Sequence, residues 1–123
     1  MDAARWIYDY KDNKPMPLIL ADHGYDIWMG NARGTEYSRG NVNGLTLDMQ
    51  EFWAWSYAEM GVYDDTANIE FIKRQTGEEK IYYMGYSEGT VQMFYALIKK
   101  GLDLSDSLHK FIALAPCSIG SLG

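Results

Sequence analysis

The stretch Ile81-Tyr82-Tyr83-Met84-Gly85-Tyr86-Ser87-Glu88-Gly89-Thr90 decides the predicted fold. Residues 80–84 are typical of a buried strand, and residues 85–89 follow the pattern G-x-S-x-G, with Tyr86 before the serine and Glu88 after it. In a strand–turn–helix context this pattern holds the serine in a strained turn and lifts its hydroxyl above a parallel sheet. Ser87 is therefore the candidate nucleophile. Gly85 and Gly89 are expected to let the two flanking segments pass close together.

The segments that follow the serine supply the expected context. Residues 91–100 predict a helix that Gly101 ends. A helical piece over residues 103–108 then leads into residues 111–115, an apolar run that ends at Pro116 and predicts a second strand.

The first part of the chain predicts one helix, one strand and a long loop. Residues 15–23 favour a helix capped by Asn13 and stopped by Gly24, and residues 25–29 are typical of a strand. Residues 30–47 have no apolar period and predict a loop, and a loop of that length is often functional.

Two further helices are predicted between this loop and the strand before the serine. Residues 48–60 indicate a short, mostly buried helix, and Asp64 and Asp65 are expected to cap a helix that runs to Thr76 and stops at Gly77. Strands that alternate with helices predict an α/β fold, with a parallel sheet covered by helices on both sides.

Composition narrows the classes of function. The 123 residues suit one domain, and the net charge of −6 without a basic cluster argues against nucleic acid as a partner. No segment has the length of a transmembrane span. The single cysteine, Cys117, rules out an internal disulfide and is expected to be a small buried apolar residue. No metal-ligand spacing and no phosphate-binding glycine loop is present, so neither a metal nor a cofactor is predicted.

In its blocks and their order the sequence resembles the acid lipase family, the gastric and lysosomal type of α/β-hydrolase. The resemblance implies hydrolysis of a carboxylic ester, an acylglycerol or sterol ester, through an acyl-serine, with a lipid ester as the partner and a secreted or lysosome-like compartment. The matching blocks are residues 20–34, 37–39, 51–60, 63–64, 69–72, 76–77, 113–116 and the G-x-S-x-G segment itself.

The chain departs from the family beside the nucleophile, where Tyr86 and Glu88 replace the usual His and Gln. The residue after the serine contributes its backbone N–H to the oxyanion hole, so the Glu88 N–H is expected to form half of that hole. Its carboxylate would repel an oxyanion unless it turns away or is neutralised. Arg33 is one possible partner for this carboxylate, and a structural arginine of the loop is the other reading.

The resemblance also implies parts that these residues do not supply. The second oxyanion donor of the family lies in a His-Gly-Leu stretch that would precede Met1, and its acid and base follow later strands. His23 and His109 come before strands, at the edge of a parallel sheet opposite to Ser87, so neither is expected to serve as the base. Residues 1–123 are therefore expected to form one incomplete α/β-hydrolase domain that is inactive on its own.

Other functions remain open from the residues. A thioesterase, a peptidase or an acyltransferase can use the same turn. A truncated or degenerate domain could instead bind a partner without catalysis, or associate with itself, through unpaired sheet edges. The aromatic residues Trp53, Trp55 and Tyr57 are interpreted as core rather than as a lipid-binding surface.

Overall fold

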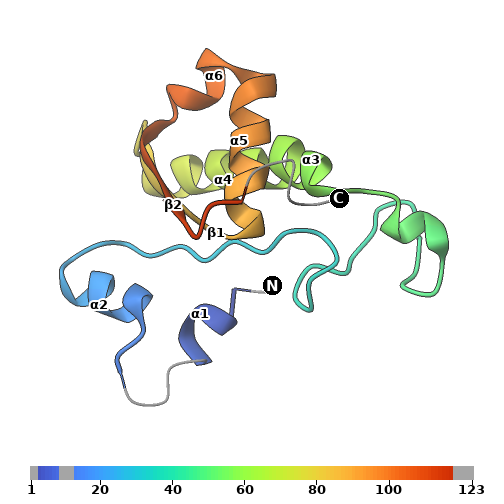
Figure 1. Cartoon of the computed structure of the whole chain (residues 1–123), viewed down its shortest axis with the longest axis horizontal. Coiled ribbons are helices and arrows are strands. Elements are labelled where there is room, and N and C mark those ends of the chain that lie inside the picture. The colour runs from blue at the N-terminus through green and yellow to red at the C-terminus, as the bar shows by residue number, and fades with distance from the viewer. Residues whose placement is uncertain (1–2, 9–12, 118–123) are drawn as a thin grey trace.

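The computed structural model describes residues 3–8 and 13–117. In that part of the chain the polypeptide forms a two-stranded sheet with helices packed against it, together with a long irregular segment (Figure 1). The elements are α1 (Arg5–Tyr8), α2 (Met16–Asp22), the 3₁₀ helix η1 (Gln50–Trp53), α3 (Tyr57–Glu59), the π-helix η2 (Met60–Asp65), α4 (Thr66–Thr76), β1 (Ile81–Tyr86), α5 (Glu88–Lys100), α6 (Leu102–Ser105) and β2 (Leu108–Leu114).

The sheet is parallel, as predicted. β1 and β2 pair from Ile81 opposite Leu108 to Tyr86 opposite Leu114, with one irregularity of register after Ile81. β2 begins three residues before the predicted strand, and α5 connects β1 back to β2 as a crossover helix. The α/β fold class is confirmed.

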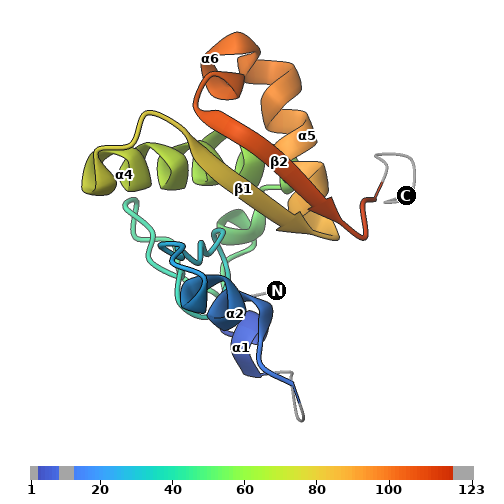
Figure 2. The ribbon, with the colours of Figure 1, turned by 90° about the vertical axis from the view of Figure 1, so that its left-hand side faces the viewer.

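Helices α4, α5 and α6 bury one face of this sheet (Figure 2). Alternation along β1 turns Ile81 and Tyr83 toward these helices, while Tyr82 and Tyr86 point away and are exposed. The buried cluster consists of Ile69 of α4, Met93 and Ala96 of α5 and Leu104 of α6.

The other face of the sheet meets the first part of the chain through aromatic side chains. The ring of Tyr25 lies edge-on to that of Tyr82, with centroids 6.5 Å apart, and Trp6 of α1 lies edge-on to Tyr86 at 6.1 Å. These contacts are edge-to-face pairs, which stabilise modestly compared with a closed core.

The prediction of a strand over residues 25–29 is wrong. These residues form no β ladder, and the described sheet contains β1 and β2 alone. A strand needs a hydrogen-bonded neighbour, and apolar pattern cannot supply one. The predicted helix before this segment is present as α2, but its N-cap residue is Pro15, and no side chain caps it, so the role expected of Asn13 is also wrong.

The helix predicted over residues 48–60 is wrong as well, because the chain breaks between η1 and α3. Ser56 caps α3: its Oγ accepts from the Ala58 N–H, and its own N–H donates to Glu59 Oε2 at 2.8 Å. From Tyr57 the chain stays helical through α3, η2 and α4 to Thr76. Asp64 and Asp65 are therefore interior residues of a helical rod and not its caps.

Candidate functional site

Ser87 lies between the end of β1 and the start of α5, at the carboxyl edge of the sheet. Its φ of 51° and ψ of −114° place a residue with a side chain in a sparsely populated backbone conformation. Its N–H donates to the Leu114 carbonyl at 2.9 Å, and its own carbonyl accepts from the Thr90 N–H at 2.9 Å and the Thr90 hydroxyl at 2.6 Å. The turn is thus held by both β2 and the first turn of α5. We call residues 85–89 the elbow.

The two glycines of the elbow play different roles. A Cβ on Gly85 would lie 2.7 Å from the Gly89 carbonyl oxygen, so β1 and α5 approach too closely for any other residue there. A Cβ on Gly89 would meet no described atom within 4 Å. The close approach of β1 and α5 therefore explains why position 85 is glycine, but it does not explain the glycine at position 89. Tyr86 is half-exposed against Trp6.

Glu88 is the first residue of α5, where backbone N–H groups have no partner within the helix. Its side chain is exposed to solvent. The partial positive charge of the helix N-terminus favours an anion at this point.

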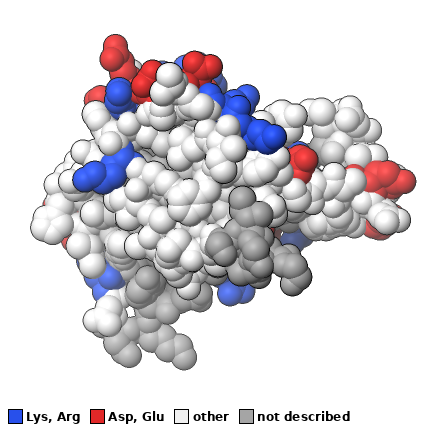
Figure 3. All heavy atoms as spheres, turned by 45° about the horizontal axis from the view of Figure 1, so that its top comes forward, with Lys and Arg blue, Asp and Glu red and all other residues white. Residues whose placement is uncertain are grey.

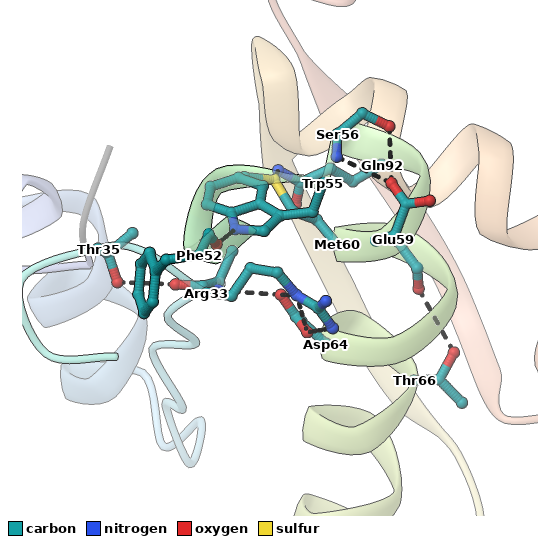
Figure 4. A network of polar contacts seen from close by, with 12 residues as sticks. Arg33, Thr35, Phe52, Trp55, Ser56, Glu59, Met60, Asp64, Thr66 and Gln92 are labelled. Carbon is teal, nitrogen blue, oxygen red and sulfur yellow. Dashed lines mark hydrogen bonds and ion pairs between the residues drawn. The ribbon is translucent and has the colours of Figure 1, made fainter. Parts of the chain in front are cut away.

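Arg33 pairs with Asp64 and not with Glu88, so the suggestion that it neutralises the Glu88 carboxylate is wrong. Its guanidinium binds Asp64 of η2, with Nε 2.9 Å and Nη2 2.6 Å from Oδ1, and its backbone N–H donates to Oδ2 of the same carboxylate (Figure 4). The hydrogen bonds that its guanidinium donates to Asp64 raise the pKa of Arg33. Arg33 is the structural arginine of the loop, and it fastens residues 30–47 to the helical rod.

Cys117 lies beside Ser87 and is not packed in the core as expected. Its Sγ is 3.7 Å from Ser87 Oγ, and its N–H donates to the Thr90 hydroxyl at 3.2 Å. The chain reaches this position through Ala115, whose φ of 45° is the second positive value of a non-glycine residue in the described chain. Cys117 follows β2, at the carboxyl edge of the sheet. Its half-buried thiol, however, faces the site instead of packing in the core.

Both histidines lie away from Ser87. His109 is the second residue of β2, at the amino edge of the sheet, where its ring lies 5.2 Å from that of Tyr82. His23 follows α2 as its C-terminal cap. The six residues of β1 separate the two edges of the sheet by roughly 17–20 Å, which is far beyond hydrogen-bond reach. The His109 imidazole therefore cannot take a proton from Ser87, and the described chain shows no hydrogen bond between His23 and Ser87.

Asp65 is a buried acidic residue whose environment the sequence did not reveal. It is 7% exposed, and its Oδ2 accepts a hydrogen bond from the Tyr83 hydroxyl at 3.0 Å. Burial raises the pKa of Asp65 to about 7, against the opposing effect of the Tyr83 hydrogen bond and with a smaller contribution from Asp64. Burial and then the charge of Asp65 raise the pKa of Tyr83 well above its ordinary value. The sequence predicted Asp65 only as a helix cap. Its contact with Tyr83 arises from the packing of η2 against β1, which local sequence pattern does not reveal.

The aromatic residues before α3 do not belong to the sheet core. Phe52 is buried, but Trp53 is 46% exposed and packs edge-on against it, which corrects the core interpretation of Trp53. Trp53 and Trp55 cover Gly34, where a Cβ would lie 2.5 Å from the Trp55 ring. These rings therefore hold the loop of residues 30–47 in place.

Surface charge on the visible face is mixed, with acidic and basic side chains interspersed (Figure 3). Near the amino edge of the sheet an open hollow is lined by both signs, including Lys73, Arg74, Glu78 and Asp103. Over residues 3–8 and 13–117 no group of three His, Cys, Asp or Glu side chains is arranged to hold a metal ion. None of the helices in that same part has both the length and the apolar character to cross a bilayer.

Comparison with known proteins agrees with this geometry. The family described as "alpha/beta hydrolase fold" matches residues 12–121. The chain is 46% identical to human lipase member M over 114 residues and 46% identical to mouse gastric triacylglycerol lipase over 114 residues, which in both cases is 93% of this chain. It is 42% identical to the human lysosomal acid lipase/cholesteryl ester hydrolase over 115 residues, or 94% of this chain.

These matches cover only part of each relative. The chain spans 26% of lipase member M and 28% of the gastric and lysosomal enzymes, about a quarter of the length of the curated relatives. The matched part of this chain contains the parallel sheet and the elbow. The chain belongs to the α/β-hydrolase fold family, and its resemblance to the acid lipases within that family is confirmed.

Proposed function

We propose that Ser87 is the acyl-accepting nucleophile of a carboxylic ester hydrolase and that the Glu88 N–H forms half of its oxyanion hole. The observation that carries this proposal is the strained φ of Ser87 at the junction of β1 and α5, at the carboxyl edge of a parallel sheet. Strained backbone at an exposed turn is a feature of sites where a side chain must be presented to a substrate.

The proposed reaction proceeds through an acyl-enzyme. The Ser87 oxygen adds to the ester carbonyl carbon, and the resulting oxyanion accepts a hydrogen bond from the Glu88 N–H at the start of α5. The alcohol leaves with a proton as the acyl-serine forms, and water then hydrolyses the acyl-serine. The proton of Ser87 requires a base that neither His23 nor His109 provides, so we infer that the base lies outside these 123 residues.

The substrate class rests on the relatives. Their names describe a triacylglycerol lipase and a cholesteryl ester hydrolase, and we propose a lipid ester, an acylglycerol or a sterol ester, as the substrate here. The same names, gastric and lysosomal, favour a secreted or lysosome-like compartment.

A chimera tests the proposal directly. The 114 matching residues of mouse gastric triacylglycerol lipase are replaced by those of this chain, so that the relative supplies the rest of the catalytic machinery. We expect hydrolysis of tributyrin and of cholesteryl oleate emulsions, reduced by about 10³-fold or more in kcat by Ser87→Ala. Ser105→Ala, at the opposite edge of the sheet, is the matched control and should change kcat by less than about twofold.

The outcome of this assay decides between reaction classes. A folded chimera that hydrolyses neither ester would sink the proposal, and selective turnover of a thioester of the same acyl chain would assign a thioesterase. The 123-residue chain alone should show negligible turnover of a short-chain ester, because an unassisted hydroxyl is weakly nucleophilic at neutral pH. Turnover by this chain that Ser87→Ala abolishes would reveal a base among its own residues.

A second candidate is a non-catalytic module that binds a partner or itself through the sheet. In the described chain β1 and β2 each have one ladder partner, so each strand has an edge that no other described strand covers. This candidate predicts that the 123-residue chain elutes as a dimer or larger species in size-exclusion chromatography. A monodisperse monomer with a sharp unfolding transition would count against it.

A further inference from the structure

We propose that Asp65 is a positioning residue for the elbow: it decides whether the Tyr83 hydroxyl donates to Asp65 or to the Gly89 carbonyl. The proposal rests on the function proposed for Ser87, because the elbow matters only if Ser87 reacts. It concerns an acidic residue in the helical rod that the mechanism above does not use.

One hydroxyl serves two acceptors in this arrangement. The Tyr83 oxygen lies 3.0 Å from Asp65 Oδ2 and 3.4 Å from the Gly89 carbonyl oxygen. A phenol carries a single proton, so it cannot donate fully to both acceptors at once. Gly89 is the fourth residue after Gly85 and the second after Ser87, so its peptide unit belongs to the turn that holds the nucleophile.

The π-helix η2 is what turns Asp65 inward. The neighbouring carboxylate, Asp64, faces the loop and pairs with Arg33, whereas Asp65 is buried against β1 (Figure 4 shows the Asp64 side). The rod can approach α5 this closely because Gly61 has no side chain, and a Cβ there would lie 2.2 Å from the Gln92 carbonyl oxygen. A π-turn in a helix often marks a functional site.

Protonation of Asp65 changes the direction of the hydrogen bond. Burial raises the pKa of Asp65 to about 7, so its charge state changes near neutral pH. The groups that act on it are the Tyr83 hydroxyl from β1 and the carboxylate of Asp64, which Arg33 neutralises, while Gln92 from α5 is uncharged and binds Met60. A protonated Asp65 donates to the Tyr83 oxygen and leaves the Tyr83 proton for Gly89. An ionised Asp65 accepts that proton, and the Gly89 carbonyl loses the hydrogen bond from Tyr83.

Selective isotope labelling allows NMR to detect this change of hydrogen-bond partner, and the measurement requires no enzymatic activity. The sequence contains two Gly-Thr steps, residues 34–35 and 89–90. Carbonyl-¹³C glycine and ¹⁵N threonine therefore give two cross-peaks in a carbonyl-edited NMR spectrum, one from the elbow and one from the loop. We expect the Gly89 carbonyl shift to titrate with a midpoint near pH 7, and the Gly34 shift to stay constant as the internal control.

Three variants separate positioning from mere packing. Asp65→Asn can donate to Tyr83 as the protonated acid does, so it should hold the Gly89 shift at its low-pH value at every pH. Tyr83→Phe keeps the ring and removes the hydroxyl, so it should abolish the titration of Gly89 while the Gly34 peak reports an intact fold. Asp65→Ala removes the competing acceptor, so its Gly89 shift should also stay constant across this pH range.

A Gly89 carbonyl that does not titrate, or that titrates equally in Asp65→Asn, would overturn this inference. The result is separable from the fate of the proposed function. An inactive chimera removes the hydrolase proposal and leaves the measured coupling in place. If the chimera is active but the Gly89 carbonyl shift does not titrate, only the role proposed for Asp65 is wrong.

Discussion

The molecule has two regions, residues 57–117 and residues 13–55, that differ in how many of their apolar side chains are buried. Of the eight buried apolar residues in the described chain, six lie in residues 57–117, which we call the sheet half, and one, Phe52, lies in residues 13–55, the loop half. The loop half instead exposes large apolar residues such as Tyr25, Trp28 and Val42. Apolar composition alone does not build a core. The sheet half has one because its strands and helices satisfy their backbone groups and can pack against each other.

The loop half is held by a few specific contacts. Tyr25 meets Tyr82 and Trp28 meets Phe71 edge-on, and Arg33 pairs with Asp64. Each such contact contributes a small amount compared with the burial of a side chain in the sheet half. Substitutions in the two halves should therefore differ in size, and the following expectations run from the largest to the smallest.

The largest effect is expected from pH acting on Asp65. Its pKa is raised from 3.8 unfolded to about 7 folded, so between these values the folded state binds more protons and loses stability as pH rises. The free energy of unfolding should fall by roughly 3 to 4 kcal/mol from pH 4 to pH 7, and Asp65→Asn should remove most of this slope. Urea unfolding at several pH values measures it.

Asp48 in the loop half is the matched control for that titration. It is exposed, and the hydroxyl of Thr46 lowers its pKa, a shift opposite in direction to that of Asp65. Asp48→Asn should leave the slope between pH 4 and pH 7 unchanged. An identical slope in wild type and Asp65→Asn would mean that Asp65 is not the group that titrates.

Truncation of a core residue compares the halves directly. Met93 is 0% exposed in the cluster of α4, α5 and α6, and Met93→Ala should lower the free energy of unfolding by about 3 kcal/mol through lost burial and a cavity. Val42→Ala, at a fully exposed loop position, should change it by less than about 0.5 kcal/mol. Equal effects in urea unfolding would show that the core assigned to the sheet half does not exist.

Adding a methyl group at a glycine compares the two halves in the opposite way, by crowding instead of by a cavity. Gly61→Ala places a methyl group on the Gln92 carbonyl, and the resulting separation of η2 from α5 should cost about 2 kcal/mol. Gly40→Ala adds a methyl group where no described atom lies within 4 Å and should be neutral within about 0.5 kcal/mol. Thermal unfolding of both variants provides the measurement, and a neutral Gly61→Ala would argue against the close approach of η2 and α5.

The smallest effect is expected at the contact that joins the two halves. Arg33→Ala removes the paired guanidinium and should cost about 1 kcal/mol, since the pair is partly exposed to solvent. Residues 30–47 should then be cleaved faster by a protease, while the exposed Arg39 of the same loop, changed to Ala, serves as the control. Unchanged cleavage in Arg33→Ala would show that the aromatic contacts alone fasten the loop.

The sequence by itself determined the elbow and its surroundings. The strand before Ser87, the helix after it and the stops at Gly77 and Gly101 follow from local pattern, because strand alternation, helix periodicity and left-handed glycines are properties of neighbouring residues. The position of His109 at the amino edge of the sheet followed from the same pattern. The family blocks added the acid lipase resemblance.

Only the tertiary structure decided the rest. Residues 25–29 look like a strand but lack a ladder neighbour, and Asp64 and Asp65 look like caps but lie inside a rod that begins at Ser56. The pairing of Arg33 with Asp64, the contact of Cys117 with Ser87 and the buried pair of Asp65 and Tyr83 each join residues at least 18 positions apart. Such contacts depend on how elements pack, and burial, which sets the pKa of Asp65, exists only once that packing is complete.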